Sequence, residues 1–205
     1  MLTKLLASVL LILACSSLQA QATYAAERAA RQQVAISVGG SITRKISNDG
    51  LMYDPTSAGL AEGSYRFYFK RWLGVEADYD YFHNSQKFST LTPTSDFRLK
   101  SDVHTLTGGA VINLPNPLTK RFTSFLYVGG GEMFFVQPNA TSFNSQMAPV
   151  IAFGGGVDVP FSRHIALRLQ GKNYLYKAPE FGTGAPKLDK YAQTLVPTAG
   201  VVLSF

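Results

Sequence analysis

The segment GVEADYDYFH, residues 74–83, alternates between apolar and polar side chains at every position up to residue 81. One face of the extended chain carries aliphatic and tyrosine side chains, and the other carries the acids Glu76, Asp78 and Asp80. A period of two is typical of a β-strand whose two faces meet different surroundings. This segment therefore predicts a strand between an apolar and a polar environment.

The same alternation recurs along the chain. It predicts eight strands, over residues 34–43, 64–70, 74–83, 98–112, 122–135, 149–159, 165–176 and 191–205. No amphipathic helix pattern separates them, which favours an antiparallel up-and-down sheet. Short connections at 70–74, 113–121 and 160–164 alternate with long ones at 44–58, 84–97, 136–148 and 177–190. This pattern predicts an all-β, eight-stranded antiparallel transmembrane β-barrel with both chain ends at the rim of short turns.

The first residues have the features of an export signal. Lys4 precedes a short leucine-rich run, and small residues follow at Ala20 and Ala22. We expect a signal peptide over 1–22, a short polar periplasmic segment over 23–33 and the barrel domain over 34–205. Cleavage after Ala20, or before Cys15 as in a lipoprotein, stays an alternative.

Composition excludes several other classes of protein. One cysteine in 205 residues rules out a disulfide framework and a cysteine zinc site. The net charge of +6 is spread along the chain, so we expect no nucleic-acid partner. The histidines His83, His104 and His164 lack metal-ligand spacing, and we expect neither a metal nor another cofactor.

If the apolar faces point to lipid, the interior should hold a cluster of charges. The acids predicted to face inward are Glu76, Asp78, Asp80, Asp102, Glu132 and Asp158, and the bases are Arg66, Lys70, Arg98, Lys100, Arg168 and Lys172. Six bases against six acids would give the near-neutral pairing that a narrow interior needs. A secreted sandwich with solvated charges is the alternative.

The same assignment directs the aromatic side chains. It points Phe125 and Tyr127 toward lipid. It also predicts interfacial girdles, with Trp72 at the short turns and tyrosines near the long loops; these are Tyr65, Tyr81, Tyr174 and Tyr176. The glycine triplets 129–131 and 154–156 lack a phosphate-loop pattern, and we expect them to make room for bulky neighbours.

The last eight residues, TAGVVLSF (198–205), resemble the C-terminal assembly signal of bacterial outer-membrane barrels, with Gly200, Leu203 and Phe205 at its key positions. More broadly, the chain after residue 22 is similar to the small OmpA-like outer-membrane β-barrel family. The resemblance implies a bacterial outer-membrane location with both termini periplasmic. Its implied partners are outer-membrane lipid and the barrel assembly machinery.

Function follows less directly from the sequence. The motif His83-Asn84-Ser85 resembles the His-x-Ser pair of outer-membrane lipid A deacylases, although in those enzymes it occurs late in the chain. We predict a non-enzymatic barrel with a filled polar interior and a structural, adhesion or receptor-like role. The sequence does not identify the ligand of its extracellular loops. A lipid-modifying barrel enzyme and a narrow, low-conductance pore are the alternatives.

Overall fold

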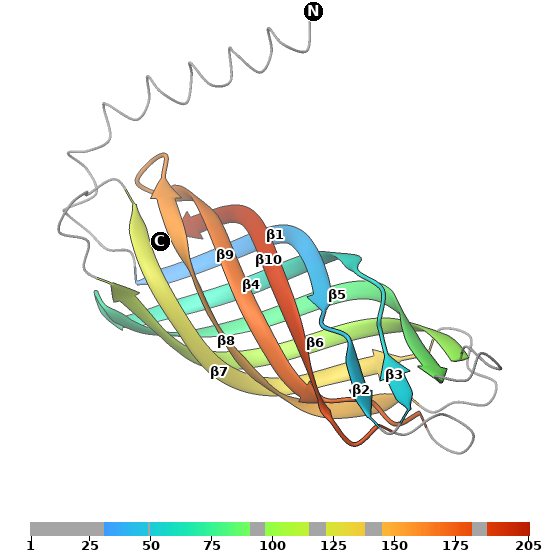
Figure 1. Cartoon of the computed structure of the whole chain (residues 1–205). Coiled ribbons are helices and arrows are strands. Elements are labelled where there is room, and N and C mark those ends of the chain that lie inside the picture. The colour runs from blue at the N-terminus through green and yellow to red at the C-terminus, as the bar shows by residue number, and fades with distance from the viewer. Residues whose placement is uncertain (1–30, 49, 91–96, 115–121, 138–144, 182–187) are drawn as a thin grey trace, which may run out of the picture.

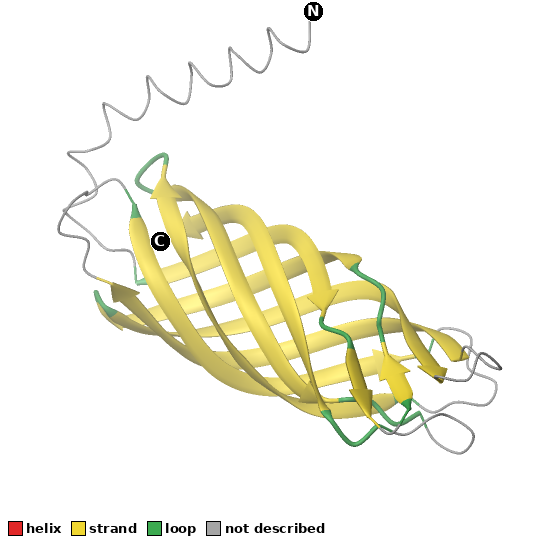
Figure 2. Ribbon diagram, viewed as in Figure 1, coloured by secondary structure: helices red, strands yellow, loops and turns green. Residues whose placement is uncertain are grey.

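The computed structural model describes residues 31–48, 50–90, 97–114, 122–137, 145–181 and 188–205, in which the chain folds into strands, turns and loops (Figure 2). The strands are β1 (Gln32–Thr43), β2 (Ile46–Asn48), β3 (Leu51–Tyr53), β4 (Ala58–Lys70), β5 (Leu73–Thr90), β6 (Phe97–Leu114), β7 (Thr123–Val136), β8 (Gln146–Pro160), β9 (Ile165–Lys177) and β10 (Tyr191–Ser204). Among these residues no helix is long and apolar enough to cross a membrane.

Eight of the strands, β1 and β4 to β10, close into an antiparallel barrel (Figure 1). Each strand from β4 to β10 pairs with the next, and β1 completes the ring between β4 and β10. At this seam Val34 lies opposite Leu203, and the backbones of Gln32 and Phe205 exchange hydrogen bonds of 3.1 and 3.0 Å. Every barrel strand therefore has a partner on both sides, which satisfies the backbone without water.

All eight predicted strands are present in the predicted order, and β4 and β5 exceed their predicted lengths the most. β4 begins at Ala58, and β5 continues to Thr90, so parts of two predicted long loops are strand. In the first of these loops, β2 and β3 form a hairpin that pairs with the far end of β5. Gly50 lies between them with φ of 80°, a conformation that glycine adopts without strain.

The two ends of the barrel differ. The C-terminus lies with the short turns at one end, and the β2–β3 hairpin lies at the other (Figure 1). β1 begins at Gln32, two residues before the predicted start of the barrel. The predicted signal peptide lies outside the described residues.

The outer surface carries a broad apolar band. Its exposed large side chains include Ile36, Val38, Phe69, Val75, Tyr79, Leu106, Leu126, Val128, Ile151, Phe153, Leu169 and Val201. Soluble monomers rarely expose an apolar surface of this extent, whereas a transmembrane barrel turns such a band to lipid. Because the sheet closes and its apolar face points outward, the sandwich alternative is wrong.

Candidate functional site

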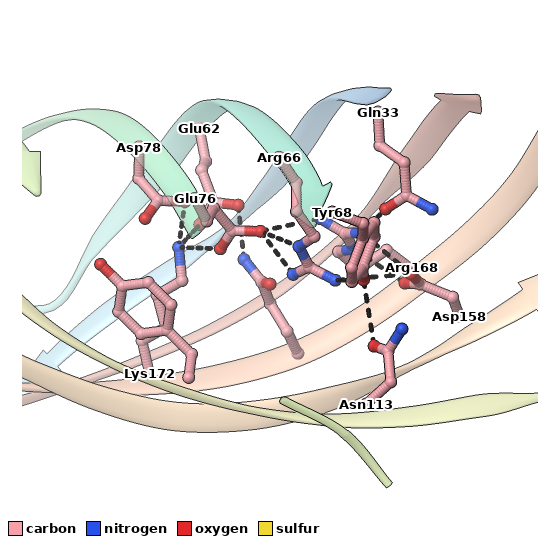
Figure 3. Close-up of polar contacts among 12 residues, drawn as sticks. Gln33, Glu62, Arg66, Tyr68, Glu76, Asp78, Asn113, Asp158, Arg168 and Lys172 are labelled. Carbon is pink, nitrogen blue, oxygen red and sulfur yellow. Dashed lines mark hydrogen bonds and ion pairs between the residues drawn. The ribbon is translucent and has the colours of Figure 1, made fainter. Parts of the chain in front are cut away.

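Charged side chains gather inside the half of the barrel nearer to the short turns. Figure 3 shows the polar contacts among them. We call this set the inner network; its members are Glu62 and Arg66 of β4, Glu76, Asp78 and Asp80 of β5, Asp158 of β8, and Arg168 and Lys172 of β9. Each is at most 7% exposed, because its position falls on the inward parity of its strand. Of the charged residues predicted to face inward, Glu76, Asp78, Asp80, Asp158, Arg66, Arg168 and Lys172 lie here, whereas Asp102, Glu132, Lys70, Arg98 and Lys100 do not.

Two arginines and two acids form the part of the inner network nearest to the short turns. Arg168 binds Asp158 in parallel, with Nε to Oδ1 at 2.8 Å and Nη2 to Oδ2 at 2.9 Å, and its Nη1 donates to Glu76 Oε2 at 3.3 Å. Arg66 Nε donates to the same Glu76 oxygen, and its Nη1 lies 3.7 Å from Asp158 Oδ2. Each arginine therefore contacts both acids, and one pair has the bidentate geometry of strong ionic hydrogen bonds.

Lys172 extends the inner network toward the middle of the barrel. Its Nζ donates to Asp78 Oδ1 at 2.6 Å and to Glu62 Oε2 at 3.4 Å, and it lies 3.7 Å from Glu76 Oε1. Glu76 is thus contacted by all three cations, which makes the network continuous. Buried charges of this kind persist only where partners offset their lost hydration.

Two aromatic rings pack against these cations. The guanidinium groups of Arg66 and Arg168 lie 4.1 and 5.1 Å from the ring centre of Phe125, and Lys172 Nζ lies 5.1 Å from that of Tyr127. Both rings are buried, so the prediction that they face lipid is wrong. Cation–π attraction adds to the stability of a desolvated cation.

Glycines opposite these rings explain why they point inward. Phe125 pairs with Gly156, and Tyr127 pairs with Gly154, both on β8. A Cβ at Gly156 would lie 2.8 Å from Phe125 Cζ, so a larger residue there would displace the ring. At these positions the triplets do provide room for bulky neighbours, but inside the barrel, and this fixes the parity of β7.

Asp102 and Glu132 do not join the inner network, and their predicted inward placement is wrong. Asp102 lies on the outer face of β6, where it accepts a hydrogen bond of 3.1 Å from Tyr81 Oη and lies 2.7 Å from His83 Nδ1. Glu132 lies on the outer face of β7 because the inward rings reverse the parity assumed for that strand.

Three bases predicted to face inward also lie elsewhere. Lys70, Arg98 and Lys100 are exposed, the first at a short turn and the others on the outer face of β6 near the long loops. Alternation alone could not assign them, because a charge can face outward wherever the strand extends beyond the apolar band.

Glu62 is the member of the inner network that the sequence analysis missed. It falls in the extension of β4, where Gly59, Ala61 and Gly63 weaken the apolar alternation. Its shared parity with Arg66 was the available signal. The inner network has five acids and three bases, not the equal numbers that were predicted. Neutral donors contribute the remaining bonds: Gln170 to Glu62, Thr107 to Asp78 and Tyr174 to Asp80.

The half of the interior toward the long loops is rich in aromatic side chains. Tyr53, Phe88, Phe135 and Phe181 are buried there, with ring centres 4.9 Å apart for Tyr53 and Phe88 and 6.2 Å apart for Phe135 and Phe181. Phe88 also contacts Phe181 edge to face at 6.4 Å. Neutral polar side chains are buried in the same half, where Gln86 Nε2 donates to Asn84 Oδ1 at 2.7 Å and Gln137 Nε2 donates to Ser101 Oγ at 2.9 Å. Among the described residues, the buried charges therefore lie in the short-turn half, and the filling toward the long loops is aromatic and uncharged.

The predicted aromatic girdles are also changed by the structure. Tyr174 and Tyr176 point inward and are buried, so they cannot mark an interface. Trp72 is exposed at a short turn, and Tyr81 is exposed on the outer face of β5. Tyr65 faces outward, but its hydroxyl donates to Gln32 near the short turns, away from the long loops.

The residues of the predicted assembly signal lie at the seam. Leu203 and Phe205 point outward and are exposed, whereas Gly200 faces inward opposite Ser37. A Cβ at Gly200 would lie 2.3 Å from the carbonyl oxygen of Ile36, so the two strands approach too closely for a larger residue. The structure thus gives Gly200 a packing role at the closing strand pair.

The His-x-Ser motif lies on the outer face of β5. His83 and Asp102 are opposite each other on β5 and β6, and Ser85 follows on the same face as His83. Within these two strands no hydrogen bond joins Ser85 Oγ to His83; the Ser85 backbone N–H donates to Thr56 Oγ1 at 2.9 Å.

In the part of the chain that the structure describes, no three His, Cys, Asp or Glu side chains are grouped to hold a metal ion.

Comparison with known proteins agrees with this architecture. Residues 7–200 match the family described as outer membrane protein beta-barrel domain. No curated protein matches the chain. Neisserial surface protein A is 10% identical with a TM-score of 0.62, and the match covers 87% of this chain and 100% of that one. The N-terminal β-barrel domain of OprF from Pseudomonas aeruginosa is 12% identical with a TM-score of 0.51, over 87% and 100% of the two chains.

A third solved structure, the outer membrane protein OprG from Pseudomonas aeruginosa, is 13% identical with a TM-score of 0.50, over 86% of this chain and 96% of that one. At these identities the similarity to solved structures shows the fold alone. The family match spans nearly the whole chain, and with the closed barrel and its outer apolar band it shows that this chain belongs to the family of outer-membrane β-barrel proteins.

Proposed function

We propose that this protein is a sealed, non-enzymatic barrel with a structural, adhesion or receptor-like role that it performs through its long loops. The observation that carries the proposal is a pair of contacts across the lumen. Arg168 and Lys172 of β9 bond to Glu76 and Asp78 of β5, and these two strands stand on opposite sides of the ring. An eight-stranded barrel has room for little more than its own side chains, and here they meet in the middle.

The aromatic half of the interior supports the same proposal. Phe181 and Leu188, which flank the last long loop, are buried against the aromatic side chains at that end of the barrel. Such packing gives the loops a rigid base, which suits a binding surface. We place the long loops outside the cell and both termini in the periplasm, in accord with short periplasmic turns and long extracellular loops in this class of barrel.

A solute-flux measurement tests the seal. Purified protein is reconstituted into vesicles, and entry of small sugars is followed by light scattering, with a wide porin as the positive control. We expect entry no faster than in protein-free vesicles. Sugar entry that rises in proportion to the amount of folded protein would support the narrow-pore alternative instead.

We further propose that the barrel assembly machinery recognises the C-terminal strand. Phe205 is exposed to lipid, and its burial is worth only about 1.5 to 3 kcal/mol, too little to abolish a stable barrel. Deleting Phe205 should sharply lower the amount of assembled protein in cells and leave refolding into detergent nearly normal. Val38→Ala, at another exposed apolar position, is the control and should change neither. Equal losses in both settings would make Phe205 an ordinary packing residue.

A second candidate function, hydrolysis of a lipid ester, is favoured by the contact between His83 and Asp102 on the outer face. An acid that accepts a hydrogen bond from His Nδ1 leaves Nε2 free to take a proton from a serine. Ser85 is the nearby serine on that face. Release of fatty acid from outer-membrane lipid that is lost in both Ser85→Ala and His83→Ala would establish this function. No release by the wild type, or release by both variants at the wild-type level, would exclude it.

A further inference from the structure

Asp78 and Asp80 lie two residues apart on β5 and are both buried inside the barrel, but they have different partners. Lys172 Nζ donates to Asp78 Oδ1 at 2.6 Å, and Thr107 Oγ1 donates to Asp78 Oδ2 at 3.3 Å. Asp80 accepts a hydrogen bond at Oδ2 from the neutral hydroxyl of Tyr174. Among the described residues no cation forms an ion pair with Asp80, and no donor reaches its Oδ1. An ionised Asp80 would therefore lack the partners that offset lost hydration.

The neighbouring strands do not supply these partners. On β6, Asp80 lies directly opposite Thr105, whose fully buried hydroxyl has no hydrogen-bond partner in the described part of the chain. On β4 it lies directly opposite a second buried acid, Glu62, and the two carboxyl groups are within hydrogen-bonding reach of each other. Two ionised carboxylates side by side in a water-poor lumen repel each other strongly, and this repulsion is relieved when the pair holds one proton.

Glu62 is the better placed of the two acids to carry the remaining negative charge. Its Oε1 accepts a hydrogen bond from Gln170 Nε2, and its Oε2 accepts one of 3.4 Å from Lys172 Nζ. A protonated carboxyl group has one O–H donor, and Oδ1 of Asp80 is the oxygen that no other donor reaches. The inner network also has two more acids than bases, so a bound proton reduces its excess of negative charge.

We propose that Asp80 and Glu62 form a proton-binding site inside the barrel, in which Asp80 keeps its proton at neutral pH and donates it from Oδ1 to Glu62. Loss of this proton at alkaline pH would leave two adjacent negative charges on β4 and β5, and the repulsion between them should destabilise the folded barrel. The site goes beyond the proposed role of the long loops, because it makes the stability of the barrel depend on a bound proton.

The other charged and titratable groups around the site lie on β5 and β9. They are Asp78, whose charge is directed to Lys172, and Lys172 and Tyr174 themselves. β1 and β6 contribute neutral side chains, with Ser37 opposite Glu62 and Thr105 opposite Asp80. Lys172 is thus the cation that faces the pair, and it is shared with Asp78 and Glu76.

Infrared spectroscopy tests the proton directly. Folded protein is placed in vesicles of ether-linked phosphocholine lipid, which has no ester carbonyl groups to hide the C=O stretching band of an un-ionised carboxylic acid. We expect this band in the wild type at neutral pH and its loss at alkaline pH. Asp80→Asn should lack the band at neutral pH. Asp54→Asn, which changes a rim acid that pairs with Lys45, is the control and should keep it.

Urea unfolding from pH 5 to pH 9 tests the effect on stability. In the unfolded chain an ordinary aspartate is ionised above about pH 4, so unfolding of the wild type would release the proton of Asp80. The ratio of the unfolding constant of the wild type to that of Asp80→Asn should rise about tenfold for each pH unit while the folded protein keeps this proton. At neutral pH, Asp80→Asn should be at least as stable as the wild type, whereas Asp78→Asn, which loses an ionic hydrogen bond to Lys172, should be less stable.

Heat-dependent gel mobility verifies that the variants are folded, and the infrared titration of the wild type needs no variant. The proposal would be overturned by the absence of the band in the wild type at neutral pH, by its persistence in Asp80→Asn, or by a ratio of unfolding constants that does not change with pH. Stability that rises with Na⁺ or Ca²⁺ in the wild type but not in Asp80→Asn would also overturn it, because a metal cation would then occupy the place of the proton. These outcomes do not depend on whether the lumen conducts.

Discussion

The inner and outer faces of β5 both carry charged side chains, yet their surroundings differ. On the inner side, Glu76 and Asp78 are bonded to cations that reach them from the opposite wall. On the outer side, Lys87 lies opposite another cation and has no acidic partner among the described residues. Charged side chains that cannot reach water must form ion pairs and hydrogen bonds with one another, whereas charged side chains at a membrane surface can stay hydrated or bind a ligand.

The largest effect should come from removing one cation of the inner network. Arg168→Leu leaves Asp158 and Glu76 with fewer bonds in a water-poor interior, which costs about 3 to 5 kcal/mol for a broken buried pair. Lys100→Leu, on the exposed outer face of β6, should cost less than about 1 kcal/mol. Urea unfolding in lipid vesicles measures both. Equal urea midpoints for the two variants would contradict the claim that Arg168 belongs to a buried ionic network and Lys100 does not.

Substitutions of glycine test how closely neighbouring strands approach each other. A Cβ at Gly154 would lie 2.1 Å from the carbonyl oxygen of Gly171, so Gly154→Ala must push two strands apart and should cost about 1 to 3 kcal/mol. Gly63 has no atom within 4 Å of the same construction, and Gly63→Ala should be nearly neutral. The urea midpoints compare the two substitutions, and a larger loss at Gly63 would contradict the strand packing described here.

The aromatic ring that covers both guanidinium groups should have a smaller effect. Phe125→Leu keeps most of the buried apolar volume but removes the cation–π contacts with Arg66 and Arg168, worth about 1 to 2 kcal/mol in a desolvated site. Phe153→Leu on the lipid face is the matched control and should change stability little. A reversed order would mean that Phe125 does not face the inner network.

The smallest effect concerns the acid that does not belong to the inner network. Asp102→Asn removes a charge from an exposed pair with His83, and such pairs contribute less than about 1 kcal/mol. Unfolding in urea should therefore hardly change. A loss of stability as large as that of Arg168→Leu would mean that Asp102 is buried inside the barrel.

Much of the fold could be predicted from the sequence, because eight strands with alternating long and short connections allow few closed arrangements. Glu76, Asp78, Arg168 and Lys172 followed from the alternation of β5 and β9, whose apolar faces are unambiguous. Glu132 did not, because Phe125 and Tyr127 fill the inner side of β7 opposite glycines. A ring packed under a guanidinium and a ring exposed to lipid look alike in a pattern of apolar residues.

The long-loop end was the least predictable part. The extension of β4 lies where small residues interrupt the period of two, and the burial of Phe181 depends on partners from distant parts of the chain. The Asp49-Gly50 pair, a frequent hairpin signal, could have indicated the β2–β3 hairpin. Packing between distant segments leaves no local signal of its own.

The central claim is that contacts between β9 and β5 close the lumen, and single-channel recording in a planar bilayer tests it most directly. Folded wild-type protein should give no current steps above those of bare lipid. The variant Lys172→Ala with Asp78→Ala, which removes one contact across the lumen, should raise the conductance. Regular steps in the wild type, of the same size as those in the variant, would show that ions bypass the inner network and would contradict the account.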